Sequence, residues 1–557
     1  MIERYITQTQ FSSYEDFCRN FHINIPARFN FAYDVVDAVA ATDPGRPALL
    51  WTDEHGAERR FTFADIAALS DSTASFFSTL GIGRGDRVML MLKRRWQFWT
   101  VMMALHKLGA VAIPATHLLT AGDIVYRCDK ADIKMIVAAG EPDLMARVDE
   151  AAPDCRSLRC RVTTGPTVPA GWLDLDEGVR TAPAFRRPGP ANENDDVMLL
   201  YFTSGTSGEP KMVAHDFTYP LGHIVTASYW HNLHPGSLHL TVADTGWGKA
   251  VWGKLYGQWL AGAEVFVYDF DKFEPADLLR QMERYRITSF CAPPTVYRFL
   301  IREDVGAYDL SALEWCATAG EALNPSVSER WRRLTGIELR EAFGQTETTL
   351  TVGTFPWMEA RPGSMGLPNP QYDIRVVDDD MAEVAPGEEG EIVIRVPEDA
   401  PKPVGLFKEY LDDPVLTAAA WHDGYYHTGD IARRDQDGYL WFVGRKDDVI
   451  KSSGYRIGPF EVESACLTHP AVVECAVTAV PDEVRGQVVK ATIVLAREYV
   501  SRAGADLIKD IQNHVKRVTA PYKYPRIIQF VKELPKTISG KIRHVAIRQA
   551  DISARHA

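Results

Sequence analysis

Hydroxyl-bearing residues and glycines cluster between an apolar stretch and a lysine, in the run Tyr201-Phe-Thr-Ser-Gly-Thr-Ser-Gly-Glu-Pro-Lys211. Glycines let backbone N–H groups approach an anion closely, hydroxyls add donors, and a lysine adds a positive charge. This is the chemistry that holds a polyphosphate. The run is not a Walker A loop, because Gly208 is followed by Glu209 and Pro210 instead of Gly-Lys-Ser/Thr. By itself, such a stretch is also typical of an ordinary flexible loop.

Three further motifs extend this chemistry along the chain. They are Arg340-Glu-Ala-Phe-Gly-Gln-Thr-Glu-Thr348, then Tyr426-His-Thr-Gly-Asp430 with Gly444-Arg445 and Lys451-Ser-Ser-Gly-Tyr-Arg456, and finally Leu534-Pro-Lys-Thr-Ile-Ser-Gly-Lys541. An ionised carboxylate accepts two hydrogen bonds side by side, so Asp430 is suited to both hydroxyls of a ribose. An aspartate after glycine is also typical of a turn, but its combination with the Gly-Arg pair favours a nucleotide.

In this order, the four motifs resemble those of the adenylate-forming superfamily, which includes acyl-CoA synthetases, peptide-synthetase adenylation domains and luciferases. The resemblance spans nearly the whole chain. The stretches Ala243-Asp-Thr-Gly-Trp247 and Val518-Thr-Ala-Pro-Tyr-Lys-Tyr-Pro525 are similar to the medium-chain acyl-CoA synthetases. This implies an AMP-forming acid:CoA ligase that converts a carboxylic acid and ATP into an acyl-adenylate and then forms the thioester with CoA.

The resemblance also implies how the nucleotide is held. Lys541 bridges the substrate carboxylate and the α-phosphate, Thr346 donates to that phosphate, and Glu347 binds Mg²⁺. Phe343 packs against adenine, where related enzymes usually carry tyrosine. The implied ATP-binding residues are Thr203, Ser204, Gly205, Thr206, Ser207, Gly208, Lys211, Gly320, Glu321, Ala322, Glu341, Ala342, Phe343, Gly344, Gln345, Thr346, Asp430, Arg445, Arg456 and Lys541.

The implied CoA site and hinge lie in the last part of the chain. The CoA-binding residues are Ser453, Gly454, Tyr455, Arg485, Lys516 and Tyr524. The charges near Lys516 suit the 3′-phosphate of CoA, although such runs are about as often a solvated helix face. Asp447 matches the hinge about which the C-terminal domain rotates, and it fits a surface turn equally well. Rotation is needed because Lys541 must leave before a thiol can reach the same carbonyl.

The acid is expected to occupy a short, broad pocket. Acetyl-specific relatives carry tryptophan where this chain has Gly344, so the sequence predicts open volume there. Acetate would leave a void, and each unburied methylene forfeits about 0.8 kcal/mol. Gly344→Trp is therefore expected to shift preference toward acetate. The implied pocket residues are Trp230, Trp247, Lys249, Trp252, Cys291 and Gly344. Medium-chain, branched or aromatic acids fit this set, although the tryptophans also suit ordinary core packing.

Alternating apolar strands and helices must position these motifs. Strands are predicted at residues 87–92, 134–138, 197–202, 264–268 and 288–292, and a helix with one apolar face at Gln97 to Leu108. Short alternating strands from residue 363 to 395 indicate an antiparallel, barrel-like subdomain. The predicted fold is α/β. An N-terminal domain (residues 1–446) has two parallel-type, helix-flanked sheets and a small β-barrel subdomain. A small mobile α+β domain (residues 447–557) follows.

Bulk properties exclude several other classes. The net charge of −13 disfavours nucleic acid or an anionic membrane surface as a partner. The eight cysteines form no Cys-x-x-Cys pair, and neither a leader-type segment nor an apolar run of membrane length is evident. We therefore expect a cytoplasmic enzyme, monomeric or homodimeric, that uses ATP, Mg²⁺ and CoA.

Two alternatives remain open at this point. The first is a stand-alone adenylation protein that loads a carrier protein, against which the CoA-type region near Tyr524 argues. The second is an inactive acyl-nucleotide-binding protein. Intact Lys541, Glu347 and Asp430 argue against that alternative.

Overall fold

Two large sheets with mostly parallel strands form the body of the molecule. The structure, a computed structural model, describes residues 1–187, 189–204, 210–321, 323–397, 399, 401–452, 455–482, 485–536 and 542–556. The nine-stranded sheet has the order β16 (Leu367–Pro368), β15 (Val352–Gly353), β14 (Leu339–Phe343), β13 (Trp315–Ala319), β12 (Ser289–Cys291), β10 (Leu238–Thr241), β11 (Glu264–Asp269), β1 (Pro47–Asp53) and β2 (Glu58–Thr62). Among the described strands of this sheet, the pairings β1–β2, β14–β15 and β15–β16 are antiparallel, and the others are parallel.

The eight-stranded sheet supplies the other half of this body. Its order is β19 (Glu409–Tyr410), β9 (Pro210–Asp216), β8 (Val197–Ser204), β4 (Val111–Pro114), β3 (Arg87–Met91), β5 (Ile133–Ala139), β6 (Cys160–Thr164) and β7 (Leu173–Asp174). Strands β3 to β8 pair in parallel, while β9 and β19 add an antiparallel edge. The predicted parallel sheets are confirmed.

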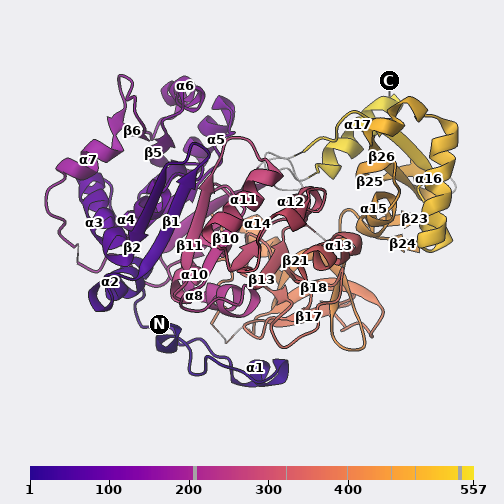
Figure 1. The fold of residues 1–557 in the computed structure, drawn as a ribbon, viewed down its shortest axis with the longest axis horizontal. Coiled ribbons are helices and arrows are strands. Elements are labelled where there is room, and N and C mark those ends of the chain that lie inside the picture. Colours follow the sequence, from indigo (N-terminus) through magenta and orange to yellow (C-terminus); the bar gives the residue numbers. More distant parts are fainter. Residues whose placement is uncertain are drawn as a thin grey trace.

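Helices cover and separate the two sheets. They are α1 (Tyr14–Asn20), α2 (Ala38–Thr42), α3 (Phe63–Thr79), α4 (Gln97–Leu108), α5 (Ala121–Ala131), α6 (Pro142–Ala151), α7 (Leu175–Thr181), α8 (Tyr219–Ile224), α9 (Gly248–Lys254), α10 (Tyr256–Leu260), α11 (Pro275–Tyr285), α12 (Pro294–Leu300), α13 (Pro325–Thr335) and α14 (Pro414–Ala420). Figure 1 shows them in indigo to orange.

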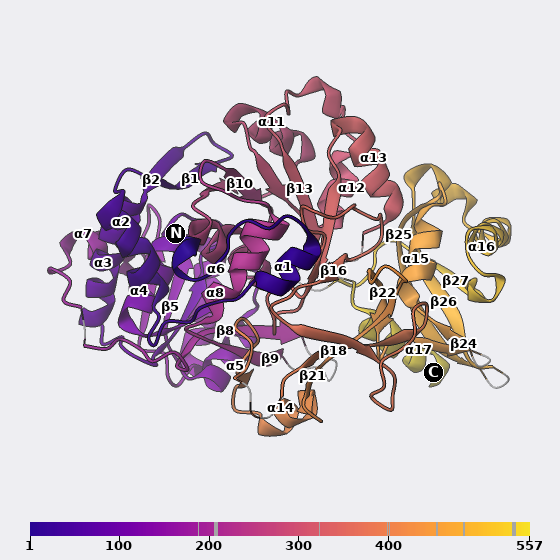
Figure 2. The same cartoon turned by 90° about the horizontal axis from the view of Figure 1, so that it is seen from below.

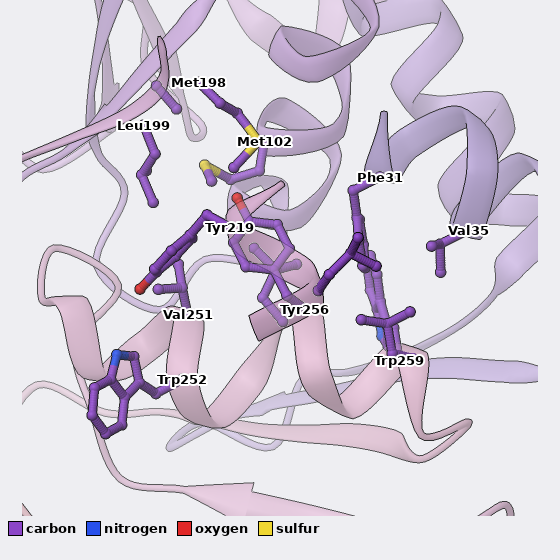
Figure 3. Packing of buried hydrophobic residues seen from close by; sticks show 14 of the residues in the cluster. Phe31, Val35, Met102, Met198, Leu199, Tyr219, Val251, Trp252, Tyr256 and Trp259 are labelled. Carbon is purple, nitrogen blue, oxygen red and sulfur yellow. The ribbon is translucent and has the colours of Figure 1, made fainter. Parts of the chain in front are cut away.

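The expected helix α4 has the predicted bounds but a different environment. Every residue from Gln97 to Leu108 is buried, so the helix is covered on all sides and not only on the predicted apolar face. The reason is that α4 lies in a core shared by both sheets, which includes Leu49 of β1 and Val88 of β3. Figure 3 shows Met102 of α4 in this core beside Tyr256 of α10. The two sheets therefore form one packed unit.

A third, antiparallel sheet follows the parallel ones. It runs β17 (Asp373–Val377), β18 (Glu389–Arg395), β21 (Tyr425–Arg434) and β20 (Trp421–His422), and β22 (Leu440–Arg445) also pairs with β21. This is the expected barrel-like subdomain; among the described strands its pairing follows this path without closing on itself. In Figure 2 it lies between the parallel sheets and the C-terminal module.

The C-terminal module has a separate sheet and core. The sheet order is β24 (Tyr455–Ile457), β23 (Ile450–Ser452), β26 (Gly486–Leu495) and β25 (Val472–Asp482), with β27 (Ile527–Val531) parallel to β26. Helices α15 (Pro459–Leu467), α16 (Ala505–Val518) and α17 (His544–His556) flank it. Figure 1 shows this module in orange and yellow. Among the described residues, none of the helices combines the length and apolar character that a bilayer crossing requires.

Candidate active site

A cavity of about 1150 Å³ lies where the ends of the three N-terminal sheets face the C-terminal module. The predicted site residues that line it are Thr203, Lys211, Gly320, Glu321, Glu341, Ala342, Phe343, Gly344, Gln345, Thr346, Glu347, Asp430 and Arg445. The C-terminal module contributes residues that include Glu463, Cys475, Lys536 and Ile542. Motifs that are far apart in the sequence are thus brought to one cavity.

The hydroxyl- and glycine-rich run begins and ends on paired strands. Thr203 of β8 lies opposite Lys211 of β9 in the antiparallel register. The Lys211 ammonium lies 5.0 Å from the ring centre of Tyr410, so the cation faces the cavity wall. Gly205, Thr206, Ser207 and Gly208, and the side chain of Ser204, lie outside the described part of the chain.

Asp430 is fixed by Arg445 of its own motif and by Gln345 of another. It pairs with Arg445 across β21 and β22, and Arg445 Nη1 lies 3.1 Å from Asp430 Oδ2. Gln345 Nε2 donates to the same carboxylate and, at 2.8 Å, to the carbonyl of Thr428. Burial raises the pKa of Asp430, while Arg445 and Gln345 act in the opposite direction. Asp430 is therefore a buried carboxylate held toward the cavity.

Glu347 follows β14 in a loop that neighbouring elements hold in place. The Tyr410 hydroxyl donates to Glu347 Oε1 at 2.8 Å, and the Phe407 N–H donates to the Glu347 carbonyl at 2.7 Å. His215 Nε2 lies 2.8 Å from the Thr346 carbonyl. Burial lowers the pKa of His215 to about 3, so the ring is neutral and Nε2 carries the donated proton. Tyr410 and His215 were missed, because neither belongs to a sequence motif.

Aromatic rings and a buried carboxyl form another wall. Phe343 faces Phe442 with 6.3 Å between ring centres, and both line the cavity. Glu341 Oε1 accepts the Leu323 N–H at 3.2 Å, and Oε2 is buried with no partner among the described residues. Glu321 is exposed, and its carboxylate accepts from the Thr295 hydroxyl at 2.6 Å. Ala322 lies outside the described residues.

Glu341 predicts a pH-dependent stability. Burial raises its pKa to about 8 from 4.5. Its contribution to stability is complete below the unfolded pKa near 4.5 and is lost as pH rises through about 8. We expect urea unfolding to show a free energy that falls over this range, with each pKa unit worth about 1.4 kcal/mol. Glu341→Gln flattens the profile, whereas the exposed control Glu321→Gln does not. Parallel profiles for wild type and Glu341→Gln would contradict this.

The predicted CoA residues lie on an exposed face of the C-terminal module. Tyr455 stacks on Tyr522 with 4.2 Å between ring centres and an angle of 18°. Lys516 Nζ lies 4.0 Å from the ring centre of Tyr524, whose hydroxyl accepts from Arg526 Nη1 at 2.9 Å. Tyr522 and Arg526 were missed, although Tyr522 belongs to the Pro-Tyr-Lys-Tyr-Pro signal.

Other predicted CoA and nucleotide residues are only partly described. The backbone N–H of Arg485 donates to Asp482 at 2.8 Å. Lys523 pairs with Glu461 at 2.5 Å, so its charge is neutralised within the module. Ser453, Gly454 and Lys541 and the side chain of Arg456 lie outside the described part.

Most of the predicted acyl pocket is packed core. Trp230, Trp252 and Cys291 are buried, Trp247 and Lys249 are partly buried, and none of these five lines the cavity. Lys249 Nζ donates to the Ala319 carbonyl at 2.6 Å. Of these five, Trp252 lies against Gly344.

The expectation of open volume at Gly344 is wrong. A Cβ atom there would lie 2.3 Å from Cη2 of Trp252 and 2.6 Å from the Thr349 carbonyl oxygen. The indole of Trp252, which Figure 3 shows at the edge of the aromatic core, already fills this space. Thr349 is fixed by a 2.8 Å hydrogen bond between its hydroxyl and that of Tyr372.

Asp447 is exposed, and the residues before and after it are each held by contacts of their own. The Lys446 N–H donates to the Gly429 carbonyl at 2.8 Å, and its ammonium lies 2.9 Å from Glu391 of β18. Asp448 pairs with Arg548 of α17 in the C-terminal module. The side chain before Asp447 therefore contacts the antiparallel sheet, and the side chain after it contacts the C-terminal module.

Comparisons with known proteins agree with the fold and the motifs. The AMP-binding enzyme family matches residues 36–411, and the AMP-binding enzyme C-terminal domain matches residues 461–541. The acyl-coenzyme A synthetase ACSM3, mitochondrial, of Pongo abelii is 42% identical over 98% of this chain and 94% of that protein. The human acyl-coenzyme A synthetase ACSM5, mitochondrial, is 41% identical over 95% of this chain and 91% of that protein.

A solved structure extends this similarity to the fold. The anthranilate CoA ligase AuaEII, in complex with anthranoyl-AMP, has a TM-score of 0.86 and 27% identity, and the match covers 96% of this chain and 99% of that one. The chain is an AMP-forming acid:CoA ligase that uses ATP and CoA. It belongs to the AMP-binding enzymes, in the medium-chain acyl-CoA synthetase branch that its motifs indicate.

Proposed function

We propose that the cavity holds ATP and the acid for the first of two half-reactions. A carboxylate oxygen attacks the α-phosphorus, and pyrophosphate leaves. Asp430 binds the ribose, Lys211 lies near the phosphates, and Thr346 donates to the α-phosphate. The single observation that carries this assignment is that residues of all four motifs line one cavity.

In the second half-reaction the CoA thiol attacks the acyl carbonyl and AMP leaves. Lys541 is proposed to act only in the first, because it must leave before the thiol can reach the same carbonyl. Its access to the cavity is supported by Lys536 and Ile542, two lining residues that precede and follow it in the sequence. We propose that the module beginning at residue 447 then rotates about Asp447. The contacts of Lys446 and Asp448 with different modules support a domain boundary between residues 446 and 447.

Mg²⁺ is proposed as the cofactor, with Glu347 as its protein ligand. Glu347 suits Mg²⁺ because it offers carboxylate oxygen at the cavity wall, and Tyr410 orients that carboxylate. No cluster of three metal-binding side chains is present in the described ranges, so phosphate oxygens and water would complete the coordination. The bound ion would offset negative charge on the phosphates.

Free CoA is favoured over a carrier protein as the acyl acceptor. On the same module, the stacked and half-exposed rings of Tyr455 and Tyr522 suit the adenine of free CoA, and the cations of Lys516 and Arg526, which lie against Tyr524, suit its phosphates. The test is a panel of carboxylic acids with ATP and CoA, read by pyrophosphate release and by thioester formation. Release without thioester would favour the carrier-protein alternative, and absence of both would favour an inactive binding protein.

The acid is proposed to be medium-chain, branched or aromatic, with its far end limited at Gly344, the cavity residue behind which the indole of Trp252 lies. Trp252→Ala removes the indole beside Gly344, so the kcat/KM ratio of longer to shorter acids should rise about tenfold for two extra methylenes. Gly344→Trp alone should instead destabilise the protein, because its side chain collides with Trp252 and backbone.

Trp247→Ala is the matched control for this substitution. It removes a second tryptophan of the proposed pocket, but one that contributes none of the three atoms nearest a Cβ at Gly344. A chain-length profile that is unchanged in Trp252→Ala would place the end of the acyl group elsewhere.

The cytoplasm is proposed as the compartment, on the ground of eight free cysteines, which suit a reducing environment. The relatives described above are named as mitochondrial proteins. Fractionation of cells that produce the full-length protein would decide between the two compartments.

A further inference from the structure

Glu391 of β18 is a buried carboxylate with three polar partners around the Asp430 turn. Its Oε1 accepts the Gly429 N–H at 3.0 Å, and its Oε2 lies 2.9 Å from Lys446 Nζ. His427 Nδ1 lies 3.5 Å from the same oxygen. The Glu391 side chain is only 7% exposed, so these contacts replace its hydration.

These partners keep the carboxylate ionised. Burial raises the pKa of Glu391, but the hydrogen bonds from His427, Lys446 and the Gly429 N–H outweigh it and lower the pKa to about 2. A buried charge that lost such partners would be strongly destabilising. The contacts are therefore strong enough to hold the backbone to which they attach.

The backbone at Gly429 departs from regular strand pairing, and this departure orients Asp430. Strand β18 pairs with β21 at Glu391–Ile431 and again at Val393–His427, so residues 428–430 bulge out of the ladder. Gly429 has φ +69°, a left-handed conformation, and a Cβ there would lie 2.9 Å from Arg445 Nη2. Bulges re-aim side chains, and here the re-aimed side chain is Asp430.

On the side of β18 the bulge has no ladder partner, so other contacts hold it there; on its other side Asp430 pairs with Arg445 of β22. The Thr428 hydroxyl donates to the Ile392 carbonyl at 2.6 Å. The Gly429 N–H goes to Glu391, and the Gly429 carbonyl accepts the Lys446 N–H. Because the Lys446 ammonium also contacts Glu391, each of the residues Glu391, Gly429 and Lys446 contacts the other two.

We propose that Glu391 is a positioning residue that holds the Gly429 bulge so that Asp430 faces the ribose, and that it ties Lys446 to the same unit. This inference rests on the proposed ribose contact of Asp430. Glu391 acts on the nucleotide through Gly429 and Asp430. Its loss should therefore weaken recognition of the ribose hydroxyls specifically.

The test compares ATP with 2′-deoxy-ATP and 3′-deoxy-ATP in the pyrophosphate-releasing half-reaction of the full-length enzyme. Wild type should prefer ATP in kcat/KM by roughly tenfold or more, the usual effect of a hydrogen bond to a charged group. Glu391→Ala should raise the KM for ATP and bring this preference close to one. Glu391→Gln keeps an oxygen acceptor for the Gly429 N–H and should restore most of the preference.

Asp379→Asn is the matched control. Asp379 also faces Lys446, at 3.6 Å, but it is 66% exposed, and the Gly429 N–H donates to Glu391 instead. The control should keep the wild-type preference for ATP. Loss of the preference in Asp379→Asn equal to that in Glu391→Ala would overturn the proposal, because Lys446 alone would then explain the effect.

Two further outcomes distinguish a failure of the ribose contact from a failure of the role of Glu391. Asp430→Ala that keeps the full preference would refute the ribose contact itself. An intact preference in Glu391→Ala, with Asp430→Ala impaired, would refute only the role of Glu391. If Glu391→Ala does not fold, Glu391→Asp carries the same test: it keeps the charge but cannot reach Gly429, so a wild-type preference in that variant would overturn the proposal.

Discussion

Lys541→Ala leaves the enzyme unable to form the acyl-adenylate, while thioester synthesis from supplied acyl-adenylate and CoA continues. The first half-reaction brings a carboxylate toward a polyanion, and a positioned cation stabilises the charge that develops. We expect pyrophosphate release to fall at least about a hundredfold, as when a single donor to a developing charge is removed. Thioester formation, measured separately from purified acyl-adenylate, should change little.

Lys536→Ala is the control for this variant. Lys536 is another lysine that lines the cavity, but its ammonium pairs with Glu474 at 2.6 Å. We expect near-normal rates in both half-reactions. Equal loss of both half-reactions in Lys541→Ala would refute the proposed role of this lysine.

Glu347→Gln should raise the Mg²⁺ concentration that is needed for half-maximal pyrophosphate release. The substitution keeps the size of the side chain but removes the negative charge that a hard cation prefers. We expect a shift of about a hundredfold, with a smaller shift of about tenfold in Tyr410→Phe, which removes only the orienting hydroxyl. Titration with Mg²⁺ at saturating ATP measures both.

The contrast between these variants separates two explanations. A Mg²⁺ titration that is unchanged in Glu347→Gln would show that the ion is held by phosphate and water alone. A shift in Tyr410→Phe without one in Glu347→Gln would place the tyrosine, and not the glutamate, next to the ion.

Local features of the fold were predictable because they depend on neighbours in the sequence. The strand before Leu92 and the bounds of Gln97–Leu108 follow from apolar runs and polar breaks. The burial of that helix on every side does not, because it depends on a second sheet formed mostly later in the chain. For the same reason, Trp252 was placed in the acyl pocket, but its contact with Gly344 was not foreseen.

In the candidate site, too, residues within sequence motifs were predictable, and their partners from other strands were not. Asp430 and Glu347 lie in motifs whose residue types indicate their chemistry. Their supports, Tyr410 and His215, come from other strands and have no local signal. Glu391 lies in a predicted strand, but the alternating residue pattern of that strand does not predict a bulge in β21, the strand that pairs with it.

The contact between Trp252 and Gly344 has an evolutionary consequence. Trp252 belongs to α9, a short helix that contributes no residue to the cavity where the nucleotide is proposed to bind. Changes of side-chain volume on α9 can therefore diversify the acids that such enzymes accept without disturbing the residues proposed to hold ATP. We expect natural variants of this scaffold to differ more on that helix than along the loop from Gly344 to Glu347.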